Sequence, residues 1–176
     1  SPLGRRDEAR SRETQWNEYV VLYRTNAQSR ALEEVLLSYS IPYRIIGGVK
    51  FYARKEVKDI IAYIRILHNP YDLVSLERII NVPPRGIGQQ TGRALVQNLS
   101  QLGVDVLTGL KQVLPSGEDT AYHKKLIPFR EALMDIEEIA KNVTVSELID
   151  YIVERTQYRN FLEATAENAT ERMENI

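Results

Sequence analysis

Apolar residues follow two different patterns along the chain, and the first occupies the N-terminal part. Residues 19–23 and 43–46 are short runs of β-forming residues, and a segment with helical spacing, capped by Ser29, lies between them. A run that is apolar at successive positions is typical of a buried strand in a parallel sheet. The order strand, helix, strand therefore predicts a βαβ unit within residues 19–50.

This βαβ unit is expected to be part of a larger α/β domain. Two strands do not form a stable open sheet, and no later segment of the sequence supplies another strand. Residues 1–18, which are polar, charged and aperiodic, are predicted to be a loose lead-in.

The second pattern begins near Arg54 and has helical periodicity throughout. It predicts a helix from there to about residue 68, and two more after the capping residues Asp72 and Thr144, the latter in a capping box with Glu147. Other helices are predicted over residues 89–102, 104–113, 120–142 and 158–164, and a last one from residue 167 that is expected to continue beyond the sequence. The predicted fold class is mainly α with a small α/β part, the helical part covering residues 51–176.

One loop of the helical part, residues 81–91 (NVPPRGIGQQT), has a distinctive composition. Two prolines stop the preceding helix, and a Gly-Ile-Gly turn leads into the next one. The start of that helix has unpaired N–H groups, which attract anions. Two interpretations stay open, a simple turn or a grip on a phosphate backbone. The candidate residues for the grip are Arg85, Gly86, Ile87, Gly88, Gln89 and Thr91.

The distribution of charge favours an anionic partner for the first part of the chain. The net charge is −1, but residues 1–100 hold 15 Lys and Arg against 10 Asp and Glu, whereas residues 101–176 hold 8 against 14. The Gly-Ile-Gly turn lies in the basic part. Two solvated faces of opposite charge would explain the same counts.

A second basic segment, residues 44–58, mixes cations with aromatic residues. Cations neutralise phosphates, and aromatic rings stack on exposed bases. The alternative for Phe51 and Tyr52 is packing between the two structural parts. The candidate DNA contacts in this segment are Lys50, Arg54, Lys55 and Lys58.

The sequence lacks the motifs of several enzyme classes. It has no cysteine, so thiolate metal sites are excluded, and a reducing cytoplasm is the compartment that fits. Its two histidines have no acidic neighbours at metal-ligand spacing, and no phosphate-binding G-x-x-x-x-G-K-S/T loop is present. No apolar run reaches the roughly 20 residues that a membrane helix needs, and we expect no membrane partner.

Four stretches together resemble a known family. YVVLYRTNAQSRALEEVLL at residues 19–37 and IPYRIIGGVKFYARKEVKD at residues 41–59 resemble the second motor domain of the UvrD/PcrA/Rep helicases of superfamily 1. LERIINVPPRGIG at residues 76–88 and RMENI at residues 172–176 resemble the helical insertion of that domain. The resemblance is strong over residues 19–99 and weak over residues 102–170.

The resemblance implies a fragment of an ATP-driven 3′-to-5′ DNA helicase of repair or replication. Residues 19–50 would belong to the RecA-like motor domain 2A and residues 51–176 to subdomain 2B, whose Gly-Ile-Gly turn is similar to a helix-hairpin-helix module. The parent protein would use ATP and Mg²⁺. The nucleotide-binding motifs lie outside this sequence, so the fragment itself is expected to hold no cofactor and to be inactive alone.

The same resemblance implies the partners. Arg24, Thr25 and Asn26 match a motif along the single-strand groove, although a helix cap would also explain Asn26. The expected partners are a DNA duplex with a single-stranded tail and the rest of the helicase motor, in the cytoplasm at the nucleoid. As an alternative, the helical part docks on a repair protein or on its own motor as an autoinhibitory module.

Overall fold

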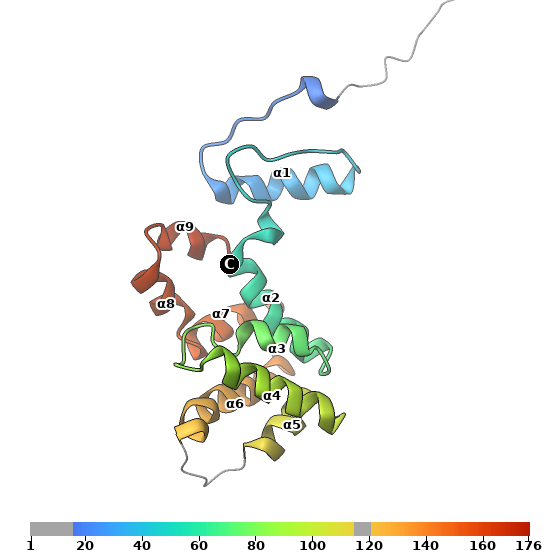
Figure 1. Ribbon diagram of the computed structural model, residues 1–176. Helices are drawn as coiled ribbons and strands as arrows, with labels where there is room; N and C mark the ends of the chain where they lie inside the picture. The colour runs from blue at the N-terminus through green and yellow to red at the C-terminus, as the bar shows by residue number, and fades with distance from the viewer. Residues whose placement is uncertain (1–15, 115–120) are drawn as a thin grey trace, which may run out of the picture. The chain divides into compact units, whose positions relative to one another are not determined.

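The computed structural model describes residues 16–114 and 121–176, apart from the side chains of four residues, Asn17, Asn26, Ala27 and Tyr122. These residues form two units that divide between Gly48 and Val49 (Figure 1). Both units consist of helices and loops. Most of the predicted lead-in, residues 1–18, lies outside the described residues, as does the predicted loop at residues 115–119.

In the first unit the predicted βαβ arrangement is wrong. This unit contains a 3₁₀ turn, η1 (Trp16–Glu18), and one helix, α1 (Asn26–Ser38), and no strand occurs among its described residues. Both apolar runs are loops. Val20, Leu22 and Ile46 are 78%, 91% and 81% exposed, so neither run is buried by a neighbour. A strand exists only through hydrogen bonds to an adjacent strand, and two short runs alone do not supply a sheet.

The helix of the first unit also begins earlier than the sequence predicts. Thr25, and not Ser29, is its N-cap, and Thr25 forms a capping box with Gln28. Ser29 is buried one turn inside the helix, where its hydroxyl donates to Glu33 Oε1 at 3.0 Å. The hydroxyl of Tyr43 donates to Glu33 Oε2, also at 3.0 Å, which ties the loop after α1 back to the helix.

The second unit follows the predicted helical pattern closely. It starts with a 3₁₀ turn, η2 (Phe51–Ala53), in which Phe51 is buried and Tyr52 is exposed. The helices are α2 (Lys55–His68), α3 (Leu73–Ile79), α4 (Gln89–Leu102), α5 (Val106–Val113), α6 (Ala121–Ala140), α7 (Val145–Arg155), α8 (Tyr158–Thr165) and α9 (Ala169–Glu174). Within this unit no described residue lies in a strand.

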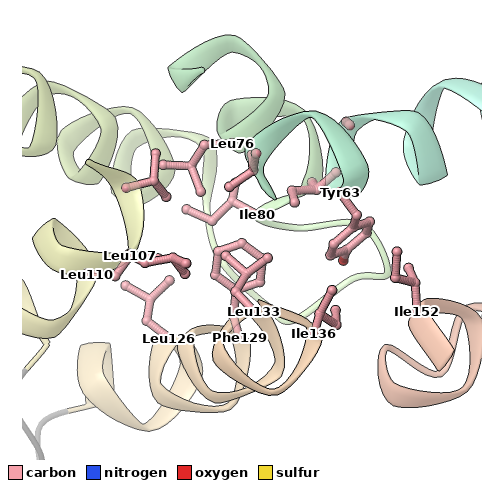
Figure 2. Close-up of a cluster of buried hydrophobic side chains, with 14 of the residues drawn as sticks. Tyr63, Leu76, Ile80, Leu107, Leu110, Leu126, Phe129, Leu133, Ile136 and Ile152 are labelled. Atoms are coloured by element: carbon pink, nitrogen blue, oxygen red, sulfur yellow. The ribbon is translucent and has the colours of Figure 1, made fainter. Parts of the chain in front are cut away.

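Each helix of the second unit packs on the next one along the chain, and α7 returns to contact α2. The unit has one hydrophobic core, to which helices α2 to α8 all contribute side chains, and Figure 2 shows part of it. Phe129 and Leu133 of α6 are fully buried at its centre, close to Leu76, Ile80 and Leu110. Each such side chain stabilises the unit by about 2 kcal/mol through the area that it removes from water.

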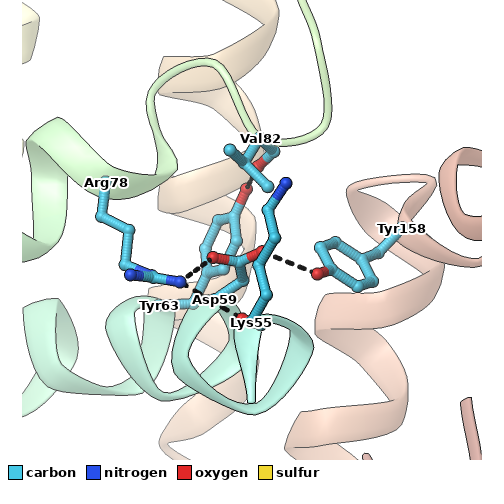
Figure 3. Close-up of polar contacts among 6 residues, drawn as sticks. All are labelled: Lys55, Asp59, Tyr63, Arg78, Val82 and Tyr158. Atoms are coloured by element: carbon cyan, nitrogen blue, oxygen red, sulfur yellow. Dashed lines mark hydrogen bonds and ion pairs between the residues drawn. The ribbon is translucent and has the colours of Figure 1, made fainter. Parts of the chain in front are cut away.

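A buried polar group joins three helices beside this core (Figure 3). Asp59 of α2 is 1% exposed and forms a 2.7 Å ion pair with Arg78 of α3. The hydroxyl of Tyr158, in α8, donates to the other carboxylate oxygen at 2.7 Å. Arg78 also donates to the carbonyl oxygen of Lys55 at 3.2 Å. A buried carboxylate is tolerated only where such partners replace water.

The helix starts predicted at Asp72 and Thr144 are confirmed, and the helix predicted from residue 104 begins at Val106, with Asp105 as its N-cap. The carboxylates of Asp72 and Asp105 each accept a bond of 2.9 Å, from the amides of Ser75 and Thr108 respectively. These bonds satisfy amides that the first helical turn leaves unpaired. Hydrogen bonds from Ser75 lower the pKa of Asp72, and the amide of Thr108 lowers that of Asp105.

These two caps make part of the free energy of unfolding depend on pH. Because the folded-state pKa is lowered, the charged caps stabilise the unit fully above the ordinary Asp pKa of about 3.9, and this stabilisation is lost as the pH falls through the lower folded value. We expect the double variant Asp72→Asn with Asp105→Asn to have a free energy of unfolding lower than that of the wild type by about 0.5 kcal/mol per site at pH 7, and the gap to close as the pH falls through the lowered folded-state pKa values. Urea unfolding across this range measures the gap. A gap that does not change with pH would contradict the assignment.

Within the described residues, no helix has both the length and the apolar character that crossing a bilayer requires.

Candidate nucleic-acid interface

The Gly-Ile-Gly loop, defined here as residues 80–88, connects α3 to α4 and is held in shape from inside. Gly86 has φ +68°, a left-handed conformation that favours glycine. The side-chain oxygen of Asn81 accepts from the amides of Arg85 at 2.7 Å and Ile87 at 3.3 Å. Ile87 itself is buried against the core, so the centre of the loop is anchored at both its main chain and its side chain.

Arg85 directs its side chain into the protein. Its Nη2 donates to the hydroxyl of Tyr63 at 2.9 Å, and its guanidinium lies 4.8 Å from the centre of the Phe129 ring. Its Nη1 donates to three carbonyl oxygens, those of Ile79 at 2.9 Å, Ile80 at 3.1 Å and Pro83 at 3.2 Å. Two of these carbonyls belong to the end of α3, where a cation is favoured. The guanidinium therefore closes the end of α3 and holds the loop against α2 and α6.

The N-terminal end of α4 is the open side of the same loop. Gly88 is its N-cap and has no side chain to cap the helix, and the amides of Gln89, Gln90 and Thr91 have no acceptor within the described part of the chain. A Cβ added at Gly88 would meet nothing within 4 Å, and Gly88, Gln89 and Gln90 are all exposed, so this end of the helix is open to solvent. Unpaired amides at a helix N-terminus bind anions.

The surroundings of this helix end are mixed in charge. Lys125 of α6 donates from its Nζ to the carbonyl oxygen of Gly86 at 3.0 Å, and its side chain is exposed. Arg93, one turn into α4, lies 4.0 Å from Glu77 in a loose, exposed ion pair. A hollow of about 200 Å³ beside the end of the helix is lined by Glu77, Ile80, Asn81, Ile87, Gly88, Gln89, Gly92 and Arg93.

The predicted basic segment divides into side chains used by the fold and side chains left at the surface. Arg54 is buried, and its guanidinium donates to the side-chain oxygen of Asn175 and lies over the Phe51 ring at 5.3 Å. Lys55 lies 5.8 Å from the Phe161 ring. The other two candidates of this segment, Lys50 and Lys58, are exposed.

In the first unit, two of the three predicted groove residues take part in the start of α1. The amides of Arg24 and Thr25 donate to the side-chain oxygen of Gln28 at 2.9 and 3.2 Å. The side chains of Arg24 and Thr25 are exposed, and that of Asn26 lies outside the described part of the structure. This segment therefore caps the helix, and the side chains of Arg24 and Thr25 face solvent.

Comparison with known proteins gives the family. The family model described as the UvrD-like helicase C-terminal domain matches residues 6–175. The chain belongs to this family.

Individual UvrD-like relatives align with almost the whole chain. It is 38% identical to the ATP-dependent DNA helicase PcrA of Bacillus subtilis over 161 residues, and 40% identical to the ATP-dependent DNA helicase UvrD1 of Mycobacterium tuberculosis (strain H37Rv) over 162 residues. These alignments cover 91% and 90% of this chain but 22% and 21% of the relatives. The chain thus spans about a fifth of the length of the curated relatives it matches.

Three residues that shape this UvrD-like loop were not predicted from the sequence. Asn81 could have been found, because an Asn before a proline-rich turn often bonds to nearby amides. Tyr63 interrupts a run of isoleucines on α2, which indicates a buried hydroxyl that needs a partner. Lys125 lies 39 positions from Gly86, and no local pattern connects the two.

Proposed function

We propose that the second unit binds the phosphate backbone of duplex DNA, independently of base sequence, as part of an ATP-dependent DNA helicase. The observation that carries this proposal is the uncapped, solvent-exposed N-terminal end of α4 at the Gly-Ile-Gly loop. Main-chain amides recognise phosphate and not bases, so they position a protein on DNA without reading it. The family and the names of the relatives support DNA as the anion.

The predicted residues of the loop take different roles in this proposal. Gln89 and Thr91, with Gln90 between them, present main-chain amides to the phosphate, while Gly86, Ile87 and Gly88 form the turn that exposes them. Arg85 acts through the shape of the loop, because its guanidinium already bonds to protein carbonyls.

A second contact region is proposed for the exposed cations of the segment after the first unit, Lys50 and Lys58, with Lys55 beside them. Exposed lysines neutralise backbone phosphates, so this region can contribute to DNA binding. Arg24, Thr25 and Asn26 are proposed to face the single strand. In this assignment residues 19–50 belong to motor domain 2A and residues 51–176 to subdomain 2B, and the remainder of the motor supplies ATP and Mg²⁺ binding.

A substitution at Gly88 tests the amide site, because it is expected to increase the stability of the fold and to weaken DNA binding. Gly88 has φ −65° and ψ 153°, which any residue adopts, and aspartate is a better N-cap than glycine. We expect Gly88→Asp to raise the free energy of unfolding by about 0.5 kcal/mol and to weaken DNA binding about tenfold or more, because a carboxylate repels phosphate. Fluorescence anisotropy with a tailed duplex, at two salt concentrations, measures the affinity.

The matched control is Gly88→Asn, which has the same shape without the charge. We expect it to keep the affinity within about threefold of the wild type. Equal binding by the wild type and Gly88→Asp, or wild-type binding that ignores salt, would refute the proposed grip.

A protein partner is the second candidate, favoured by the exposed acids of the later helices. The Glu138 and Glu131 side chains are 72% and 52% exposed, and DNA should avoid such a face. Capture of a repair protein or of the motor domain at a salt concentration that abolishes DNA binding would support this role.

A further inference from the structure

We propose that Tyr63 is a positioning residue of the DNA grip, one that keeps the carbonyl oxygens of the Gly-Ile-Gly loop turned away from the phosphate. Tyr63 lies on α2, outside the loop, and it is not one of the residues for which the family resemblance implies a DNA contact. This inference rests on the proposed function. It makes α2 a support of the binding site as well as part of the core.

The geometry places the Tyr63 hydroxyl between two parts of the loop region. The residue is fully buried, its hydroxyl donates to the carbonyl oxygen of Val82 at 2.9 Å, and it accepts from Arg85 Nη2 at 2.9 Å (Figure 3 shows Tyr63 with Val82). One oxygen therefore both holds the main chain before the prolines and orients the guanidinium. Burial raises the pKa of Tyr63, an effect that the Arg85 guanidinium opposes, and the hydroxyl keeps the proton that it donates.

These bonds pair main-chain carbonyl oxygens of the loop region and leave the amides at the start of α4 unpaired among the described residues. Donors of three side chains, Arg85, Tyr63 and Lys125, occupy the carbonyl oxygens of Ile79, Ile80, Val82, Pro83 and Gly86. A carbonyl oxygen carries partial negative charge and would repel a phosphate at short range. With these five oxygens bonded to cations or a hydroxyl, their negative partial charge is offset beside the unpaired amides at the start of α4.

The test compares two tyrosines that each lose one buried hydroxyl. Tyr63→Phe removes the bond to Val82 and the acceptor for Arg85, whereas Tyr158→Phe removes a bond to Asp59, one turn earlier on α2, and leaves both bonds of Tyr63 in place. We expect Tyr63→Phe to weaken binding of the tailed duplex about 3- to 10-fold, with an unchanged dependence on salt because no phosphate contact is lost. Tyr158→Phe should stay within about twofold of the wild type although it also loses a buried bond.

Hydrogen exchange measured by NMR on the 176-residue chain without DNA gives a second readout. The amides of Arg85 and Ile87, which donate to Asn81, should exchange about tenfold faster in Tyr63→Phe and at the wild-type rate in Tyr158→Phe.

Three outcomes separate the hypotheses. Wild-type affinity in Tyr63→Phe, or equal losses in the two variants, would overturn the positioning role while leaving the proposed DNA binding intact. A wild-type chain that shows no salt-dependent binding would overturn the proposed function, and the positioning role for DNA with it. A reduced salt dependence in Tyr63→Phe would mean that a phosphate contact was lost, which also contradicts the inference.

Discussion

Replacing Arg85 with alanine should lower the free energy of unfolding by about 3 kcal/mol, because three carbonyl oxygens lose a charged donor and the Phe129 ring loses its cation. The free carbonyls at the end of α3 then face the buried side of the loop without partners. Urea unfolding followed by circular dichroism measures the change. Arg85→Lys should recover less than half of the loss, since an ammonium is a point charge and does not span the separated carbonyls and Tyr63 together.

The matched control for Arg85 is Arg93, whose side chain is 69% exposed and forms a loose, exposed ion pair with Glu77 at 4.0 Å. We expect Arg93→Ala to change stability by less than about 0.5 kcal/mol. A wild-type stability in Arg85→Ala, together with a salt dependence of DNA binding reduced by about one counter-ion, would instead identify Arg85 as a phosphate contact.

The helices of the second unit could be predicted because their signals are local. Apolar spacing and capping residues determine them, and α4 begins and ends at the predicted residues 89 and 102. The apolar runs of the first unit carry an equally clear local signal, but a strand also needs a partner strand. Leu22 lies within a run of β-forming residues, yet it is 91% exposed in a loop. The sequence pattern therefore indicated that the segment can form a strand, but it could not show whether a partner strand is present.

The candidate site shows the same division between local and distant signals. The open helix end after Gly88 follows from a glycine at an N-cap position, which the sequence displays. The direction of Arg85 does not follow from any local pattern, because it is decided by Tyr63, 22 positions earlier, and Phe129, 44 positions later. A basic residue next to a Gly-Ile-Gly turn therefore suggested a phosphate contact, whereas the fold uses its charge to saturate carbonyls.

The other large effect on stability is expected on replacing Asp59, and a second aspartate–arginine pair in the chain serves as its comparison. Asp59 pairs with Arg78 and Asp135 pairs with Arg155, both at 2.7 Å, and both arginine side chains are 35% exposed. The aspartates differ, since the side chain of Asp59 is 1% exposed and that of Asp135 is 48% exposed. The two pairs therefore differ in the burial of the acid and in the bond that Asp59 accepts from Tyr158.

Asp59→Ala should lower the free energy of unfolding by about 3 kcal/mol, because the buried hydroxyl of Tyr158 loses its acceptor and the Arg78 guanidinium loses its partner. Asp135→Ala should cost about 0.5 kcal/mol, since water screens the exposed pair and solvates the arginine that remains. Urea unfolding of both variants under one condition gives the two costs side by side. Similar costs would mean that Asp59 is solvated in solution, and the contact of α8 with α2 through Tyr158 would then contribute little to the unit that holds the Gly-Ile-Gly loop.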